Sequence, residues 1–230
     1  MSKPYTDADF SAQITQDRTW RLKEITDLKS AIDRADNRLR RVLLRALVTV
    51  CYAHWEGYVR FAAQKYLEHV ALRKFQYGDL DRQFLRNYFL PRLEALSRSK
   101  VSIKERCILV DDVLDSSVRR FSRVNTDLVD TKANLSYGVF SEICQVCAVP
   151  TASFEDKADF LDIFLLKRRN SIAHGEETYI EYDDADDLAS QTIEMMRKFG
   201  DALENHVYLK AYRLPGDLSG TLSSTPSVGS

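Results

Sequence analysis

The stretch RRNSIAHGEE, residues 168–177, contains two arginines, an asparagine and a histidine, and it comes directly after a strongly apolar run. On a helix, Asn170 and His174 are four residues apart and share a face, while Arg169 lies about 140° round from His174 at roughly 100° per residue. Arginine presents a permanently charged planar fork that suits phosphate, and histidine titrates near neutral pH. Together these side chains have the parts for acid–base chemistry at a phosphate without a metal.

The same residues also have a purely structural interpretation. Arginine and histidine near a helix C-terminus interact favourably with the helix dipole, and Gly175 stands where a helix commonly ends. Of the four histidines, only His174 follows an arginine by five, six or seven positions. This spacing adds weight to the catalytic interpretation, but a basic C-terminal cap stays open beside it.

A second group of candidates is YAHWEGYVR, residues 52–60, in the apolar middle of a long helical segment. An ionised carboxylate is costly to bury without a partner, so we expect Glu56 either to lie beside a cation or to face solvent. His54 and Trp55 suit a packing role, and Gly57 would let another helix approach closely.

The cysteines give no metal or redox motif. Cys144 and Cys147 form CQVC, but no second pair of Cys or His lies close in sequence to complete four zinc ligands. A thioredoxin-type site would follow a strand, and no strand is expected there. We therefore expect reduced thiols buried in a helix. Since glycine-rich phosphate loops, GxSxG and HExxH are also missing from the sequence, it predicts no metal site and no cofactor.

The elements that would position these residues are helical. Apolar residues recur at helical spacing over residues 17–69, as one helix and then a longer helix that is apolar nearly all round, which is typical of the centre of a bundle. The only strand-like pattern is the short TYIEY, so the sequence predicts an all-α bundle. Further helices are expected around residues 80–89 and 92–97, separated by Pro91, then at 102–122, after Asn134 or Ser136 as N-cap, at 156–174 and at 184–209.

The bulk properties suit one domain, residues 1–212, followed by a Ser- and Gly-rich tail, residues 213–230, that we expect to be disordered. The net charge of −1 gives no overall attraction to nucleic acid or to an anionic membrane. The N-terminal residues lack the pattern of a signal peptide, and no 18 apolar residues run together. A cytoplasmic protein without membrane contact is the expectation.

Local charge is more informative than the total. Basic residues gather in segments 34–45 and 98–123, each of which is typical of a solvated helix face, although together they could line a groove for a nucleic-acid backbone. Seven acids lie within the twelve residues 176–187, which opposes RNA binding there unless basic residues compensate. This acidic run is also a candidate surface for a partner. The candidate RNA-binding residues are Arg41, Arg45 and Arg168.

Four blocks of the sequence resemble the HEPN superfamily of helical domains. DRTWRLKEITDLK, YAHWEGYVR, NTDLVDTKANLSYGVFSEIC and RRNSIAHGE occur in the order typical of its RiboL-PSP-HEPN-like branch from prokaryotic toxin and defence loci. The resemblance covers residues 15–210. It implies an all-α, HEPN-type helical bundle with additional helices, which forms a homodimer so that two copies of the motif face one cleft.

The resemblance also implies roles for the motif residues. Arg169 would stabilise charge on the scissile phosphate, His174 would transfer protons, and Asn170 would orient the catalytic groups or the RNA. We add Glu56 as a candidate supporting partner of Arg169. Some toxins of the superfamily carry a tyrosine two residues after the histidine as a target of inactivating modification, whereas position 176 here is glutamate, with Tyr179 and Tyr182 nearby.

The implied activity is metal-independent cleavage of RNA by attack of a 2′-OH on the adjacent phosphate, in a toxin or antiviral effector with RNA as substrate. An antitoxin or another defence protein is the expected partner. The alternative is a non-catalytic HEPN module that binds a partner protein or a nucleotide and regulates a neighbouring effector. An intact motif favours the first function, and net acidity favours the second.

Overall fold

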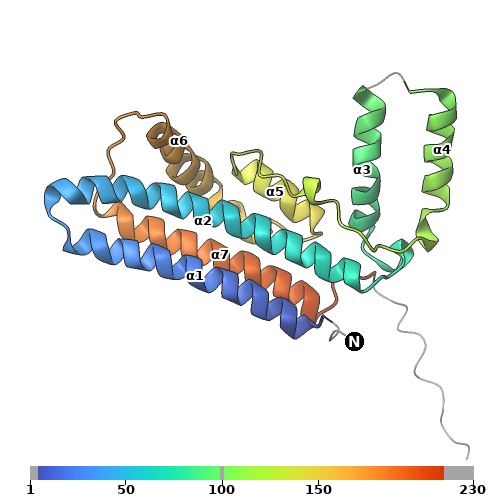
Figure 1. The fold of residues 1–230 in the computed structure, drawn as a ribbon, viewed down its shortest axis with the longest axis horizontal. Coiled ribbons are helices and arrows are strands. Elements are labelled where there is room, and N and C mark those ends of the chain that lie inside the picture. The colour runs from blue at the N-terminus through green and yellow to red at the C-terminus, as the bar shows by residue number, and fades with distance from the viewer. Residues whose placement is uncertain (1–4, 99–100, 215–230) are drawn as a thin grey trace, which may run out of the picture.

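The computed structural model describes residues 5–98 and 101–214. Within these ranges the chain is helical, and two isolated β-bridges are the only strand-like pairing. Three long helices, α1 (Asp7–Arg34), α2 (Asn37–Leu72) and α7 (Asp184–Tyr208), lie side by side along the length of the molecule (Figure 1). The predicted all-α bundle is confirmed for the described residues, and TYIEY forms no strand there.

Helix α2 is the centre of the bundle, as its apolar composition predicts. It begins where Asp36 accepts a hydrogen bond from the backbone N–H of Leu39 at 2.9 Å, a typical N-cap. Trp55 in its middle is fully buried, with its ring centroid 5.1 Å from that of Phe140 in α5 (Tyr137–Val146) and 6.5 Å from that of Phe199 in α7. The predicted packing role of Trp55 is therefore confirmed.

Two glycines let the long helices approach each other. A Cβ atom on Gly57 would lie 2.6 Å from Nη1 of Arg21 in α1, which confirms the predicted close approach at this position. A Cβ atom on Gly200 of α7 would overlap the hydroxyl of Tyr58, which is fully buried on α2. Packing at Gly200 therefore depends on the missing side chain, whereas at Gly57 the contact is with the end of the Arg21 side chain, which can shift.

Helix α3 (Arg82–Arg98) corrects one prediction, because it runs through Pro91 as a single helix. Proline removes one N–H donor from the helical ladder but leaves the bonds of the other turns in place, so the helix can continue past it. Helices α3 and α4 (Ile103–Leu114) project from one end of the bundle (Figure 1).

Helix α4 corrects a second prediction, since it ends at Leu114 and does not reach residue 122. After a short 3-10 turn the chain becomes extended, and the backbone N–H of Phe121 donates to the carbonyl oxygen of Phe75 at 2.9 Å. The Phe121 ring is 94% buried, with its centroid 5.4 Å from that of Phe84. This anchor, made between residues distant in sequence, overrides the local helical pattern.

Helix α5 (Tyr137–Val146) begins at Ser136, whose hydroxyl accepts a hydrogen bond from the backbone N–H of Val139, so Ser136 is the N-cap. Both thiols of CQVC are buried and unpaired, as predicted. Burial raises the pKa of the Cys144 thiol to about 12, which makes it unreactive at neutral pH. In the described part of the chain, no cluster of His, Cys, Asp and Glu is arranged to hold a metal ion.

The segment that carries the motif is helical throughout, but not as one regular α-helix. A 3-10 helix (Ala152–Lys157) leads into a π-helix (Phe160–Lys167), and α6 (Arg168–Ala173) follows directly. Short π-helical turns are frequent at functional sites, and here the whole apolar run before the motif has this geometry.

Two further predictions concern membrane contact and the C-terminal tail. Among the described helices, none has the length and apolar character needed to cross a membrane. The predicted tail lies outside the described residues from position 215 onward, although Tyr212 just before it is buried.

Candidate functional site

The end of α6 is closed by glycine and backbone hydrogen bonds. His174 is the C-cap, and Gly175 follows with a φ of +81°, the left-handed conformation that favours glycine. The N–H of Gly175 donates to the Ile172 carbonyl at 3.1 Å, and the N–H of Glu176 donates to the Ser171 carbonyl at 2.9 Å. This pattern is a Schellman motif. The helix terminus is therefore satisfied by its backbone, and the side chain of His174 is exposed to solvent.

Arg169 is held in a defined position. Its guanidinium carbon lies 3.8 Å from the centroid of the buried Tyr52 ring, a cation–π contact, and Nη2 donates to the Ala133 carbonyl oxygen at 3.0 Å. The Tyr52 hydroxyl is itself fixed, since it accepts a hydrogen bond from the backbone N–H of Leu135 at 2.7 Å. The Nε atom of Arg169 is buried without a hydrogen-bond partner, so the donors that remain for a ligand are those on the two Nη atoms that the bond to Ala133 does not use.

Arg169 lines an open cavity of 490 Å³ together with Glu56 and Arg60. The Glu56 carboxylate lies 3.9 Å from the Arg60 guanidinium one helical turn later, and Arg60 also donates to the hydroxyl of Thr131. The cation beside Glu56 is therefore Arg60. Glu56 and Arg169 line the same cavity but form no ion pair in the described part of the chain, so a supporting role of Glu56 toward Arg169 stays a prediction. With two guanidinium groups and one carboxylate, the three side chains carry a net positive charge that suits a phosphodiester. The cavity is also lined by Thr49, Tyr52, Ala53, Gly57 and Ala133.

Asn170 is fixed by the same loop that contacts Arg169. Its amide nitrogen donates to the side-chain oxygen of Asn134 at 3.2 Å. Immediately before Asn134, Lys132 and Ala133 have φ values of 52° and 55°, a left-handed conformation that non-glycine residues adopt at a cost of about 1 kcal/mol each. Strain of this kind persists where surrounding contacts hold it. Besides Arg169 and Asn170, these contacts include the bond from the N–H of Lys132 to Asp130 at 2.8 Å and the bond from the N–H of Asn134 to the Thr131 carbonyl at 3.0 Å.

Sequence reasoning did not single out Tyr52, Arg60, Ala133 or Asn134 as site residues. All four lie within the blocks YAHWEGYVR and NTDLVDTKANLSYGVFSEIC that carry the resemblance. Membership of these blocks was the only signal, because nothing in the spacing of an aromatic ring or an alanine carbonyl indicates that it will hold an arginine 36 or more residues away.

The three candidate RNA-binding arginines have different surroundings. Arg168 forms an ion pair with Asp184 at 2.9 Å, and the Nη1 atom of Arg45 donates to the backbone carbonyl of Glu176 at 2.9 Å and to that of Thr178 at 3.3 Å. Arg41 is exposed and has no hydrogen bond or ion pair with any residue of the described ranges. Arg45 therefore supports the loop after the motif, and Arg41 is the most available of the three.

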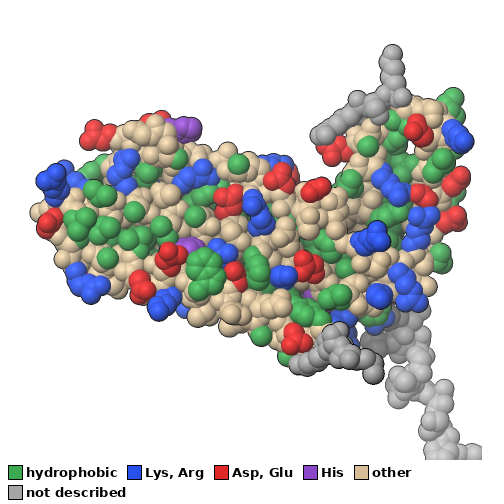
Figure 2. Space-filling view, in the orientation of Figure 1, with side chains coloured by type: hydrophobic (Ala, Val, Ile, Leu, Met, Phe, Trp, Pro, Cys, Tyr) green, Lys and Arg blue, Asp and Glu red, His purple; other side chains and the backbone are tan. Residues whose placement is uncertain are grey.

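The acidic run is partly neutralised. Asp186 pairs with Lys29 of α1, and Asp184 with Arg168. Acidic and histidine side chains are exposed over the end of α6 (Figure 2). Tyr182 donates from its hydroxyl to Asp33 at 2.9 Å, whereas Tyr179 has 69% of its surface exposed. Of these two tyrosines, Tyr179 is the more accessible for modification.

A helical bundle with an arginine, an asparagine and a histidine at the end of one helix is the arrangement expected of a HEPN-type domain. Residues 16–205 match the RiboL-PSP-HEPN family, and the chain belongs to this family. No curated protein and no solved structure gives a significant match to the chain. The match confirms the resemblance drawn from the four sequence blocks.

Proposed function

We propose that this HEPN domain is a metal-independent endoribonuclease that acts as a toxin or antiviral effector. The observation that carries the proposal is the contrast between two neighbouring arginines. Arg168 is neutralised by Asp184, whereas Arg169 has no carboxylate partner among the described residues and lines a cavity, where Tyr52 and Ala133 hold it in place. An arginine fixed in this way is suited to receive charge from a ligand.

The proposed reaction is transesterification within the RNA. The 2′-oxygen attacks the adjacent phosphorus and gives its proton to one histidine, while the 5′-oxygen leaves with a proton from a second group. Arg169 stabilises the negative charge that develops on the phosphate oxygens, whereas Arg60 in the same cavity is already paired with Glu56. The products are a 2′,3′-cyclic phosphate and a 5′-hydroxyl. Asn170, held by Asn134, orients the strand or the histidine.

The test is incubation of the purified protein with total RNA in EDTA, followed by mapping of the fragment ends. We expect cleavage to persist in EDTA, to leave 2′,3′-cyclic phosphate ends, and to spare DNA, which lacks the attacking hydroxyl. Arg169→Ala and His174→Ala should each lower the rate by about 10²–10⁴-fold, the usual size of acid–base and charge-stabilising contributions. Arg168→Ala, which removes an arginine already paired with Asp184, should lower the rate much less than Arg169→Ala.

Circular dichroism and melting curves of the variants separate the two interpretations of the motif. Folded but inactive Arg169→Ala and His174→Ala proteins support catalysis, whereas loss of the fold would support a structural cap. Cleavage that requires Mg²⁺ would contradict the mechanism. A parent protein that binds RNA or a partner and never cleaves would favour the non-catalytic module, for which the net charge of −1 is the supporting observation.

A further inference from the structure

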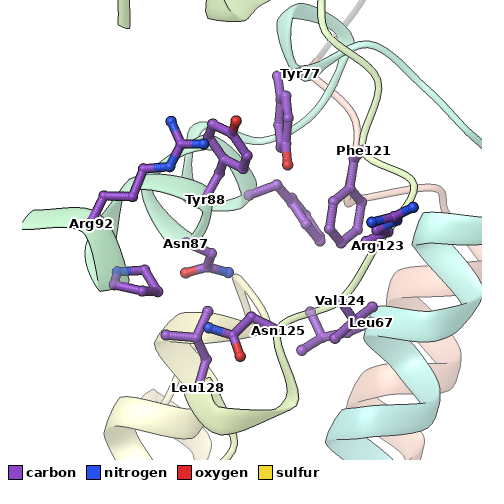
Figure 3. Close-up of a pocket in the computed structure, with 12 residues that line it drawn as sticks. Leu67, Tyr77, Asn87, Tyr88, Arg92, Phe121, Arg123, Val124, Asn125 and Leu128 are labelled. Atoms are coloured by element: carbon purple, nitrogen blue, oxygen red, sulfur yellow. The ribbon is translucent and has the colours of Figure 1, made fainter. Parts of the chain in front are cut away.

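A second cavity, of 220 Å³, lies between α3 and the segment at residues 121–128 (Figure 3). Its walls are mainly ring faces and aliphatic side chains from three parts of the chain. Binding cavities for drug-sized ligands measure about 300–1,000 Å³, so this one suits a single small ring system. The wall residues used below are Leu67, Tyr77, Tyr88, Phe121, Val124 and Leu128.

The aromatic part of this cavity is ordered by contacts between its own rings. The centroid of Tyr77 lies 5.4 Å from that of Tyr88 and 5.8 Å from that of Phe121. Arg119 donates to the Tyr88 hydroxyl at 3.1 Å, and the guanidinium carbon of Arg92 lies 4.6 Å from the Tyr88 ring centroid. Figure 3 shows these rings around the space, with the Arg92 side chain reaching over Tyr88.

Polar groups with unused capacity line the same space. Asn87 is 92% buried, and its amide nitrogen donates to the Val146 carbonyl oxygen at 2.7 Å, which uses one of its two N–H donors. The side-chain oxygen of Asn125 accepts from the backbone N–H of Asp127 at 3.1 Å, and its amide nitrogen has no acceptor in the described ranges. Arg123 is exposed at the rim without a hydrogen bond or ion pair to any described residue.

This combination fits the base of a nucleotide. Aromatic rings and arginine planes stack on the faces of unpaired bases, and amide side chains hydrogen-bond to their edges. A guanidinium at the rim suits the adjoining phosphate. The Asn87 oxygen already accepts from Gln83 at 2.9 Å, so one N–H donor of Asn87 and the amide nitrogen of the exposed Asn125 are the groups left to bond with a ligand. The edge of a base carries acceptors for such donors, whereas an aliphatic ligand carries none.

One continuous segment of the chain, residues 123–134, contributes residues to this cavity and to the candidate site around Arg169. This segment supplies Val124 and Leu128 to the second cavity, and at its other end it supplies the Ala133 carbonyl and Asn134 to the candidate site. On α2, Arg60 and Leu67 line the two cavities and are two helical turns apart, about 10 Å along the axis. Stacked nucleotides repeat about every 3.4 Å, so roughly three would span this distance.

We propose that this cavity binds one unpaired base of the RNA substrate, roughly three nucleotides from the phosphate held by Arg169. The distance of this base from the phosphate at Arg169 rests on the proposed function, because it describes the RNA substrate that the ribonuclease would select. The base site itself is a binding site and can be tested without cleavage.

The experiment uses the full chain carrying His174→Ala, so that RNA stays intact, and a 12-nucleotide single-stranded RNA with one 4-thiouridine. Irradiation should cross-link the base to Tyr77, Tyr88 or Phe121, as mapped by mass spectrometry. Val124→Trp should fill the cavity and weaken RNA binding by about tenfold or more, in line with the loss of one stacked base. Val110→Trp, on the exposed surface of α4, is the matched control and should bind like the parent.

Arg123→Ala keeps the test decisive if Val124→Trp fails to fold, because an exposed arginine without described partners can be removed safely. Excess uridine 5′-monophosphate should compete with the cross-link, and ribose 5-phosphate should not.

Cross-links outside the cavity, or RNA binding by both variants that equals that of the parent, would overturn the proposal. Binding of the mononucleotide without any RNA cross-link would overturn RNA as the source of the base. Cross-linking at the cavity in a parent protein that never cleaves RNA would support the base site and refute the ribonuclease alone.

Discussion

His69 is a buried histidine that no proposed activity uses. It lies on α2, with its ring centroid 5.1 Å from that of Phe10, and its Nε2 atom is 3.3 Å both from the Arg73 guanidinium and from the Asp7 carboxylate. Burial, reinforced by the positive charge of Arg73, lowers the pKa of His69 to about 4, although Asp7 acts in the opposite direction. The folded protein therefore holds this ring neutral at pH values where an unfolded chain would charge it.

This difference predicts acid sensitivity. Between the unfolded pKa of about 6.5 and the folded pKa of about 4, the unfolded state binds more protons, so the free energy of unfolding rises with pH in this window and falls on acidification. From pH 7 to pH 5 His69 should account for a loss of about 2 kcal/mol. Urea unfolding at both pH values should show a smaller loss for His69→Gln than for the parent. An exposed-histidine control, His174→Gln, should keep the parental loss, and equal losses in all three proteins would contradict the prediction.

At the residue scale, the sequence predicted which side chains to consider but not what each one contacts. The spacing of Arg169, Asn170 and His174 on a helix is local information and was readable. The difference between Arg168, paired with Asp184, and Arg169, stacked on Tyr52, depends on contacts across the fold. Because neighbouring helical residues point about 100° apart, two adjacent arginines of equal chemistry end in unlike surroundings.

At the scale of the elements, we predict opposite effects of the same substitution at two glycines, one at the contact between α7 and α2 and one in α5. Gly200→Ala should gain up to about 1 kcal/mol in helix propensity, yet its Cβ would overlap the hydroxyl of the fully buried Tyr58 and lie 2.9 Å from Nη1 of Arg18. Overpacking of this kind costs about 1–3 kcal/mol, so we expect net destabilisation. In contrast, Gly138→Ala in α5 would meet only Ser136 Oγ at 3.8 Å and should stabilise slightly.

Chemical denaturation of both variants checks the pair. Opposite signs are the expected result, since the two substitutions are chemically identical and differ only in the space around the new methyl group. If Gly200→Ala were as stable as Gly138→Ala or more so, the close approach of α2 and α7 would not limit packing.

The elements that the sequence predicted well are those whose signals are local. Helices α2 and α7 have long apolar periodicity and occur as expected. Helix α1 also occurs, but it begins at Asp7 and not at residue 17, because Thr6 and Asp9 form a capping box there. The errors at Pro91 and after Leu114 have another origin. A proline affects only the helical turn in which it lies, so it did not end α3. The extended chain after α4 is fixed by the burial of Phe121 against Phe84, which comes earlier in the sequence. Apolar periodicity does not distinguish a π-helix from an α-helix, so the π-helical geometry before α6 could not be predicted from the sequence.

For the whole molecule, the groups present in the candidate site suggest that a second copy of the chain completes it. Transesterification needs a base for the 2′-OH, an acid for the leaving oxygen and a cation between them. Of the four histidines, all within the described ranges, His54 and His69 are buried, His206 is partly buried, and His174 alone is exposed. His174 does not line the cavity that contains Arg169. A two-fold axis near α6 would bring two copies of both residues into one cleft, because an isologous interface uses the same surface on each chain.

The surface beside the motif has the apolar character that such an interface needs. Ile163 and Phe164, in the π-helix before α6, have 52% and 42% of their surfaces exposed. We therefore predict that Ile163→Asp converts a homodimer into a folded monomer, measured by light scattering, and lowers RNA cleavage to the level of His174→Ala. Ile108→Asp on α4 is the matched control, since Ile108 is 51% exposed on a helix remote from the motif, and it should stay dimeric and active. A monomeric Ile163→Asp protein with parental activity would rule out a composite site and leave Arg169, Asn170 and His174 to act within one chain.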